Sequence, residues 1–225
     1  MMKNLVFTEH TQFIFKSMLA GALLALAGGT FSGCISLTTL SQNLILAKLV
    51  GAFLFSLGII GSIVLKANLY TSKIGYVDTK NKAIRIVWIL LINVSIAFII
   101  GFLYRGVNGF IDMGTFGPDS ARATRPLYQN FFYGCSCGVL LHIAEEMYRR
   151  TKNFLVIIIC VMAFILSGGE HGIACAFFFG ASELSWIGLG QLWLIILGNT
   201  VGGIAISWMI KGADFLSNLP PDIHR

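Results

Sequence analysis

The residues that could carry chemistry gather in residues 167–172, which read Ser-Gly-Gly-Glu-His-Gly. Here a carboxyl group and an imidazole interrupt a strongly apolar part of the chain. An imidazole can change its charge near neutral pH, so it can take part in proton transfer. Because adjacent residues on a helix point in different directions, we expect one of the two to face a site and the other to brace the fold. We assign the site to His171 and the brace to Glu170. A buried histidine satisfied by a backbone carbonyl is the alternative.

The apolar run before this segment is too short to cross a membrane. Residues 154–166 carry no charge. A helix through them covers roughly 20 Å, whereas the hydrocarbon core is about 30 Å thick. The glycines then break the helix before a second apolar run, 174–179. A broken backbone at membrane depth must be packed in protein or line a watery cavity, and an ionisable residue at the break is typical of a transport site.

The composition supports a polytopic membrane protein that forms one domain, residues 1–225. Of 225 residues, 56% are hydrophobic and 12% charged, and the mean hydropathy is +0.80. The net charge of +6 comes from connecting segments, so it indicates membrane topology and not a nucleic-acid partner. The five cysteines fall in or beside apolar runs and are interpreted as buried hydrophobes. We expect no metal site, no cofactor and no enzymatic activity.

Six spans are predicted, of which the second and fifth are broken. They cover residues 13–31, 47–65 with a break at 66–73, 83–103, 127–147, 154–166 with 174–179, and 187–210, after a polar tail of residues 1–11. The two tails and the 2–3 and 4–5 connections hold ten Lys or Arg residues, and the other connections hold four. The positive-inside rule therefore predicts a plasma (inner) membrane protein with both termini in the cytoplasm.

A weak internal repeat relates the two halves of the chain. The third span contains Asn93 five residues after a tryptophan, and the sixth contains Asn199 six residues after one. Two three-helix copies must be inverted relative to each other, with the site between their breaks. Thr71 is then the counterpart of His171, with a plain turn hydroxyl as the alternative. The two asparagines are expected to make interhelical hydrogen bonds, and Asn199 also to orient the breaks.

Three further groups are interpreted from their spacing. Glycines four residues apart predict close helix contacts at 29/33, 134/138 and 198/202. His142 with Glu145 and Glu146 has metal-ligand spacing, but the arginines that follow favour a solvated face with ion pairs. Lys66 either reaches the membrane edge or adds positive potential to an anion path.

These residues together resemble the formate/nitrite transporter family. Residues 167–174, Ser-Gly-Gly-Glu-His-Gly-Ile-Ala, are similar to its Ser-Gly-Phe-Glu-His-Ser-Ile-Ala signature in the broken fifth span. Residues 198–203 match its Gly-Asn-x-x-Gly-Gly, and residues 69–71, Leu-Tyr-Thr, stand where the family has Leu-Phe-Thr. The resemblance covers essentially the whole chain.

The resemblance implies an aquaporin-like fold of two inverted repeats and a homopentamer with one pore in each protomer. It makes His171 and Thr71 the central pore pair, beside Tyr70 and Asn199, with Asn93 as a brace. Phe164 falls at an aromatic constriction, and Ile59 or Leu57 would supply the other. The implied cargo is a small monovalent anion with a proton across the lipid bilayer. Formate comes first, and nitrite or hydrosulfide is the alternative.

The chain also departs from the family pattern. Asn68 replaces an acidic residue and Tyr133 replaces a lysine of the fourth span, so positive charge must come from Arg122, Arg125 and Lys66. A bare carboxylate-sized anion costs on the order of 20 kcal/mol to desolvate fully. Protonating it at neutral pH costs only about 4 kcal/mol. We therefore expect permeation of the neutralised anion. A neutral-solute channel of the aquaporin kind is the alternative of another class, although neither break carries Asn-Pro-Ala.

Overall fold

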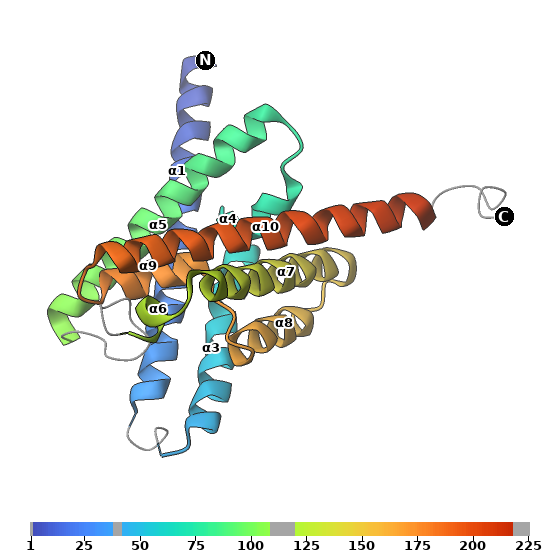
Figure 1. Cartoon of the computed structure of the whole chain (residues 1–225). Coiled ribbons are helices and arrows are strands. Elements are labelled where there is room, and N and C mark those ends of the chain that lie inside the picture. The colour runs from blue at the N-terminus through green and yellow to red at the C-terminus, as the bar shows by residue number, and fades with distance from the viewer. Residues whose placement is uncertain (1, 38–41, 109–119, 218–225) are drawn as a thin grey trace.

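The protein is helical throughout the part that the computed structural model describes, residues 2–37, 42–108 and 120–217. The helices, in chain order, are α1 (Met2–Ser36), α3 (Leu44–Val64), α4 (Tyr70–Lys73), the 3-10 turn η1 (Ile74–Tyr76), α5 (Lys80–Asn108), α6 (Ala121–Thr124), α7 (Leu127–Thr151), α8 (Leu155–Leu166), α9 (Gly172–Gly180) and α10 (Trp186–Ser217) (Figure 1). The predicted all-α fold is confirmed.

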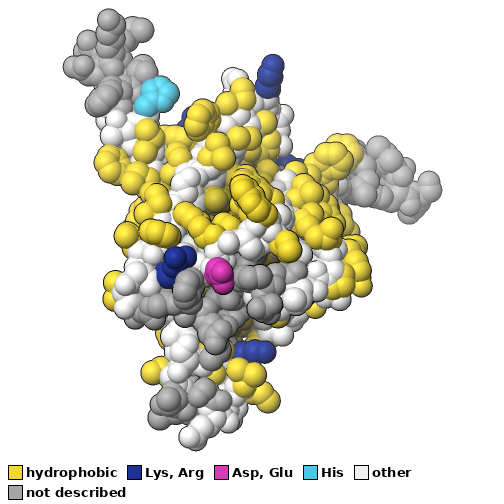
Figure 2. All heavy atoms as spheres, turned by 60° about the vertical axis from the view of Figure 1, so that its left-hand side comes forward, with side chains coloured by type: hydrophobic (Ala, Val, Ile, Leu, Met, Phe, Trp, Pro, Cys, Tyr) yellow, Lys and Arg dark blue, Asp and Glu magenta, His cyan; other side chains and the backbone are white. Residues whose placement is uncertain are grey.

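Four helices are long and apolar enough to cross a membrane by length and composition. They cover Thr8–Ser36, Leu44–Val64, Lys80–Val107 and Trp186–Phe215. α7 is comparable in length, with 25 residues, but carries more polar side chains. Helix α1 begins at Met2, so most of the predicted polar tail of residues 1–11 is helical and continuous with the first span. Figure 2 shows hydrophobic side chains over much of one face with few charged groups among them, as expected of a membrane protein.

The second and fifth spans are interrupted where the sequence predicts it. α3 ends at Val64 and α4 begins at Tyr70, while α8 ends at Leu166 and α9 begins at Gly172. In the second interruption Gly168 has a φ of +84°, a conformation that a residue with a side chain rarely adopts. The glycine pair of the 167–172 segment therefore allows the chain to turn between two helices.

In each broken span, the part that follows the break packs against the other half of the protein. α1 packs against α3 and α5, and α7 packs against α8 and α10 in the same way (Figure 1). α9 then packs on α5 and α1 of the first half, while η1 packs on α10 and α4 on α7 of the second half. Each break is thereby enclosed between both halves, which is the position that the inverted-repeat plan requires.

Close glycine contacts join α7 to α10. A Cβ on Gly138 would lie 2.3 Å from the backbone oxygen of Asn199, and one on Gly202 would lie 2.2 Å from that of Cys135. The predicted contacts of the 134/138 and 198/202 glycines are therefore confirmed. The prediction is wrong for Gly33, because a Cβ there would meet no atom within 4 Å.

Candidate functional site

His171 and Thr71 face each other between the two breaks. The Thr71 Oγ1 atom lies 3.0 Å from His171 Nε2, and both side chains are buried. Thr71 belongs to α4, and His171 is the N-cap residue of α9, where its Nδ1 accepts the Ala174 N–H at 3.2 Å. A ring nitrogen that accepts a hydrogen bond carries no proton, so the neutral ring holds its proton on Nε2 and donates it to the Thr71 hydroxyl.

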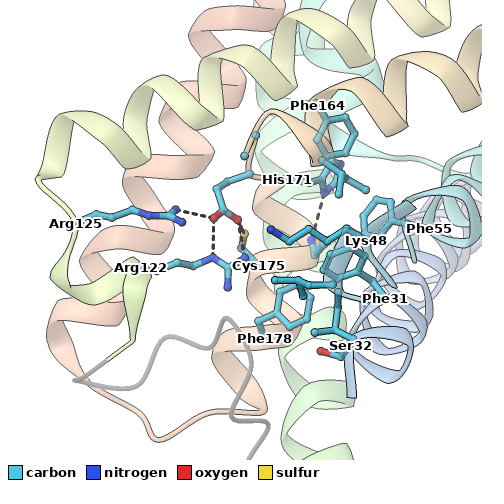
Figure 3. A pocket seen from close by; sticks show the side chains of 17 residues that line it. Phe31, Ser32, Lys48, Phe55, Arg122, Arg125, Phe164, His171, Cys175 and Phe178 are labelled. Carbon is cyan, nitrogen blue, oxygen red and sulfur yellow. Dashed lines mark hydrogen bonds and ion pairs between the residues drawn. The ribbon is translucent and has the colours of Figure 1, made fainter. Parts of the chain in front are cut away.

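Glu170 points away from this pair into a cluster of cations. Arg122 donates to both of its oxygens, from Nε at 2.9 Å and from Nη2 at 2.8 Å, and Arg125 Nη1 donates at 2.9 Å (Figure 3). The Cys175 Sγ atom lies 3.3 Å from the same carboxylate. The side chain is only 7% exposed. A buried carboxylate held by two guanidiniums has the geometry of a brace, because each charge is paired and hydrogen-bonded.

Asn199 holds the ends of the second break. Its Oδ1 accepts the Gly172 N–H at 2.7 Å, and its Nδ2 donates to the carbonyls of Glu170 at 2.9 Å and Gly134 at 2.8 Å. Asn93 serves the first break, where its Oδ1 accepts the Tyr70 N–H at 2.9 Å. Both asparagines thus make the interhelical hydrogen bonds that the sequence predicts, and both are fully buried.

A cavity of about 370 Å³ opens onto His171, and we call it the His171 vestibule. It is bounded by parts of α1, α3, α8 and α9 and by the α6 segment (Figure 3). Its described polar lining consists of Ser32, Lys48, Arg122, Arg125, Glu170 and His171. With three cations and one carboxylate, these lining residues carry a net charge of +2 when the imidazole is neutral. The vestibule therefore attracts anions.

Two phenylalanines line the vestibule beside the His171 ring. The centroid of the Phe164 ring is 6.5 Å from that of His171, and the Phe55 centroid is 6.3 Å from it. The two phenylalanine rings stand nearly perpendicular, 6.1 Å apart. The aromatic role expected of Phe164 thus has a partner in Phe55. For the other predicted constriction the sequence named Ile59 or Leu57, of which Leu57 is 55% exposed and Ile59 lies in the core.

Two other predicted site residues lie elsewhere. The Tyr70 hydroxyl lies 2.6 Å from Thr200 Oγ1, so it connects α4 to α10. Lys66 lies in the turn after α3, with a φ of 52° and an exposed side chain, and it lines neither the His171 vestibule nor the cavity at the opposite end of the protein. The structure therefore does not bring Lys66 to the anion path.

Two buried amides position the arginines and were missed in the sequence. Asn130 donates from Nδ2 to the Arg122 carbonyl at 2.8 Å and to Gln191 Oε1 at 2.7 Å. Gln191 donates to the Arg125 carbonyl at 3.4 Å. Both amides interrupt apolar spans, which is the signal that identified the other two asparagines. Lys48 was also missed as a lining residue, because its charge was counted only for topology.

Among the described residues, no group of three or more His, Cys, Asp or Glu could hold a metal ion. The residues of α7 that have metal-ligand spacing instead lie in different surroundings. Glu146 accepts from Arg150 Nε at 2.9 Å and from the Tyr76 hydroxyl at 2.8 Å, as an ion-paired face predicts. His142 is only 2% exposed, so the solvated face expected there is wrong for this residue.

The chain is similar to known proteins in both sequence and fold. The family model described as "Formate/nitrite transporter" matches residues 3–212. Two proteins named "Nitrite transporter NirC", from Salmonella typhimurium and Escherichia coli, are 38% identical over 96 and 95 residues. Each match covers 37% of this chain and 35% of the relative, so the chain spans about a third of the length of the curated relatives it matches.

Two solved structures share the fold along nearly the whole chain. A chain described as "FNT family ion channel" has a TM-score of 0.77 at 23% identity, covering 96% of this chain and 93% of that one. A chain described as "Pentameric formate channel with formate bound" has a TM-score of 0.77 at 20% identity, covering 93% and 98%. Because the family model spans both breaks and the His171–Thr71 pair, this membrane protein belongs to the formate/nitrite transporter family.

Proposed function

We propose that the protein is a channel for small monovalent anions of weak acids, with formate first and nitrite or hydrosulfide as alternatives. The hydrogen bond between His171 and Thr71 carries this proposal. It joins the two breaks at a positively charged vestibule, beside the Phe164 and Phe55 rings. The names of the relatives support the anion class, since one group is called nitrite transporters and one structure a formate channel.

The charges of the vestibule favour entry of the anion, and the aromatic rings oppose its passage as an ion. Full desolvation of a carboxylate-sized anion costs on the order of 20 kcal/mol, still several after relaxation. Neutralising a carboxylate with a pKa near 4 at pH 7 costs about 4 kcal/mol. The cheaper path is for Lys48, Arg122 and Arg125 to draw in the anion and for a proton to join it before the rings.

His171 relays this proton while Thr71 holds an oxygen of the anion. In the resting site the Nε2 proton faces Thr71, and Nδ1 is bonded to the Ala174 N–H. The anion takes the Nε2 proton as Nδ1 takes one from vestibule water, so the ring stays neutral and exchanges its tautomer. The hydrogen bond to Ala174, which itself lines the vestibule, must open during this step.

Topology and assembly are part of the same proposal. The distribution of Lys and Arg places both termini in the cytoplasm, so the His171 vestibule opens to the opposite side of the membrane. We expect five protomers, each with its own pore, because the structural relative of matching fold is described as pentameric. Crosslinking in native membranes, read as a ladder that ends at five copies, tests the assembly.

Osmotic swelling of proteoliposomes tests the function. Liposomes are exposed to formate, nitrite, hydrosulfide or glycerol, with protein-free liposomes as the control. The proposal expects fast swelling in the weak-acid anions and none above the control in glycerol. Swelling in glycerol alone would replace the proposal by a neutral-solute channel. The order among the three anions identifies the preferred cargo.

A further inference from the structure

A second cavity, of about 310 Å³, lies at the opposite end of the protein from the His171 vestibule. It is bounded by the N-terminal parts of α1 and α5, by the segment from Asn68 to Val77, and by the C-terminal part of α7. We call it the Glu145 vestibule. Thr71 belongs to the same 68–77 segment, so the central pair lies between the two cavities.

The lining of the Glu145 vestibule is strongly positive. Its described charged residues are Lys73, Lys82, Arg85, Arg149 and Glu145. Lys82 donates to Asp78 at 2.7 Å, and this hydrogen bond lowers the pKa of Asp78, so one cation is balanced within the turn. Arg85 lies over the Phe13 ring and Arg149 over the Tyr76 ring, contacts that leave their charges intact.

Glu145 is the carboxylate among these cations, and its surroundings differ from those of its neighbour. Its Oε2 atom is buried and has no hydrogen-bond partner among the described residues. Lys73 and Arg149 line the same cavity, so their charges act on the carboxyl group. Glu146, one residue further on, is fully engaged with Arg150 and Tyr76. Only the first of the two acids is therefore available to the cavity.

The other titratable groups nearby are fixed in different contacts. His142 lies 4.9 Å from the Tyr76 ring, measured between centroids, and does not line the cavity. Lys211, from α10, donates to the Gly75 carbonyl at 3.3 Å. Glu145 is thus the lining group whose ionisation can change the charge of the cavity.

We propose that the Glu145 vestibule is a second binding site for small monovalent anions, in which the Glu145 carboxylate competes with the anion for Lys73 and Arg149. When the carboxylate is ionised, its negative charge offsets these cations, and when it takes up a proton their full positive charge acts on an anion from solution. The affinity for an anion therefore rises as the pH falls. This inference rests on the proposed function, because it adds a loading site to the same path.

Chloride and nitrate separate this effect from protonation of the cargo, since neither changes its charge between pH 4.5 and 8. Binding is measured on the full chain in lipid nanodiscs by chloride NMR line broadening and by nitrate calorimetry. Replacing the carboxylate by an amide in Glu145→Gln removes one charge from the cavity. At pH 8 we expect affinity to rise about tenfold, as for a unit charge several ångströms away in a partly solvated site.

The matched control is Glu146→Gln, which removes a neighbouring charge that is already paired outside the cavity. We expect its pH profile to follow the wild type, whereas that of Glu145→Gln is flat. Lys73→Met is a second variant and should weaken binding at every pH. If Glu145→Gln follows the wild-type profile, or if Lys73→Met binds as the wild type does, the competition proposal is overturned.

The swelling assay distinguishes this failure from failure of the proposed function. If wild-type liposomes pass formate and nitrite while chloride affinity is independent of Glu145, only the competition proposal fails. If they pass neither anion while binding still depends on Glu145, the conduction proposal fails and the binding site remains.

Discussion

Asn93 and Asn199 occupy equivalent positions in the two halves of the protein and make the same three hydrogen bonds. Each side-chain oxygen accepts the N–H of the first residue of a helix, Tyr70 or Gly172. Each amide nitrogen donates to the carbonyl two residues earlier, of Asn68 or Glu170. The third bond of each goes to a carbonyl of the helix that opens the same half, that of Ser17 at 2.7 Å or of Gly134 at 2.8 Å.

This equivalence shows where the two halves differ. The residue between the two bonded backbone groups is Leu69 in the first break and His171 in the second. The residue before it is Asn68 in the first and Glu170 in the second, and only the second is paired with arginines. The inverted repeat thus builds a symmetric frame, and the ionisable groups stand on one side of it. The proposed chemistry belongs to the second break, and Thr71 reaches it from the first.

Removing either asparagine side chain should destabilise the protein. Asn199→Ala leaves the buried Gly172 N–H and Glu170 carbonyl without partners, which costs about 2 kcal/mol or more at about 1–3 kcal/mol for each group, whereas the Gly134 carbonyl keeps its bond within α7. Asn93→Ala should cost a similar amount, because it loses the same three bonds. Thermal unfolding in one detergent measures both. Asn43→Ala is the control, since it removes one exposed helix cap worth about 1 kcal/mol. Equal losses in all three variants would contradict the shared frame.

Sequence reasoning predicted the frame well, because breaks, apolar run lengths and buried amides are local signals. The internal repeat predicted that His171 lies near Thr71, because the two breaks that carry these residues are both recognisable in the sequence. Sequence reasoning missed Phe55 because every residue of an apolar span fits the pattern, and the one that meets His171 depends on how α3 rotates. Lys66 was placed wrongly for a related reason. The sequence shows a charge at membrane depth but not the direction in which its side chain points.

Glu170→Gln should be more damaging than a change at a surface acid. The amide leaves Arg122, which is 13% exposed, and Arg125, which is 27% exposed, without a counter-charge. Breaking a buried pair costs about 3–5 kcal/mol, and the partial exposure here favours the lower value. Glu146→Gln is the control, because its partner Arg150 is 49% exposed and such pairs contribute up to about 1 kcal/mol.

Thermal unfolding of both variants measures this difference. Adding Arg122→Met to Glu170→Gln should restore part of the lost stability, since it removes a buried charge that the Glu170 carboxylate balances in the wild type. A double variant less stable than the sum of the single changes would show that the arginine has another role.

Adding one methyl group at the α7–α10 contact should separate the two helices. In Gly138→Ala the new Cβ would lie 2.3 Å from the Asn199 backbone oxygen, so the backbone must move, at a cost of about 1–3 kcal/mol. Gly33→Ala is the matched control, because its Cβ meets nothing within 4 Å. Alanine stabilises a helix relative to glycine by up to about 1 kcal/mol, so the control should melt higher. A shift of the same sign in both variants would contradict the predicted contact.

The hydrogen bond between Tyr70 and Thr200 has a direction that mutation can reveal. Thr200 Oγ1 donates its one proton to the Ile196 carbonyl at 2.8 Å, so the Tyr70 hydroxyl must be the donor in their 2.6 Å contact. Tyr70→Phe leaves Thr200 satisfied and should cost about 1 kcal/mol. Thr200→Val leaves a buried phenol without its acceptor and should cost about 1–3 kcal/mol. The reverse order in thermal unfolding would assign the donor role to Thr200.

Replacing His171 tests the proton relay and can be separated from its structural role. His171 caps α9 through Nδ1, and asparagine is a strong N-cap residue that cannot carry a proton. His171→Asn should therefore keep the melting temperature, while His171→Phe lowers it by the loss of a cap worth about 1 kcal/mol.

Both variants should reduce formate flux in proteoliposomes by about 10²-fold, the contribution expected of one positioned proton-transfer group. The pH dependence decides the mechanism. If protonation occurs in vestibule water alone, His171→Asn keeps the wild-type rise of flux as the pH falls. If the imidazole relays the proton, the variant loses the part of that rise which depends on proton transfer through the ring. Wild-type flux with a wild-type pH profile in His171→Asn would reduce His171 to a helix cap and leave Thr71 as the polar group of the site.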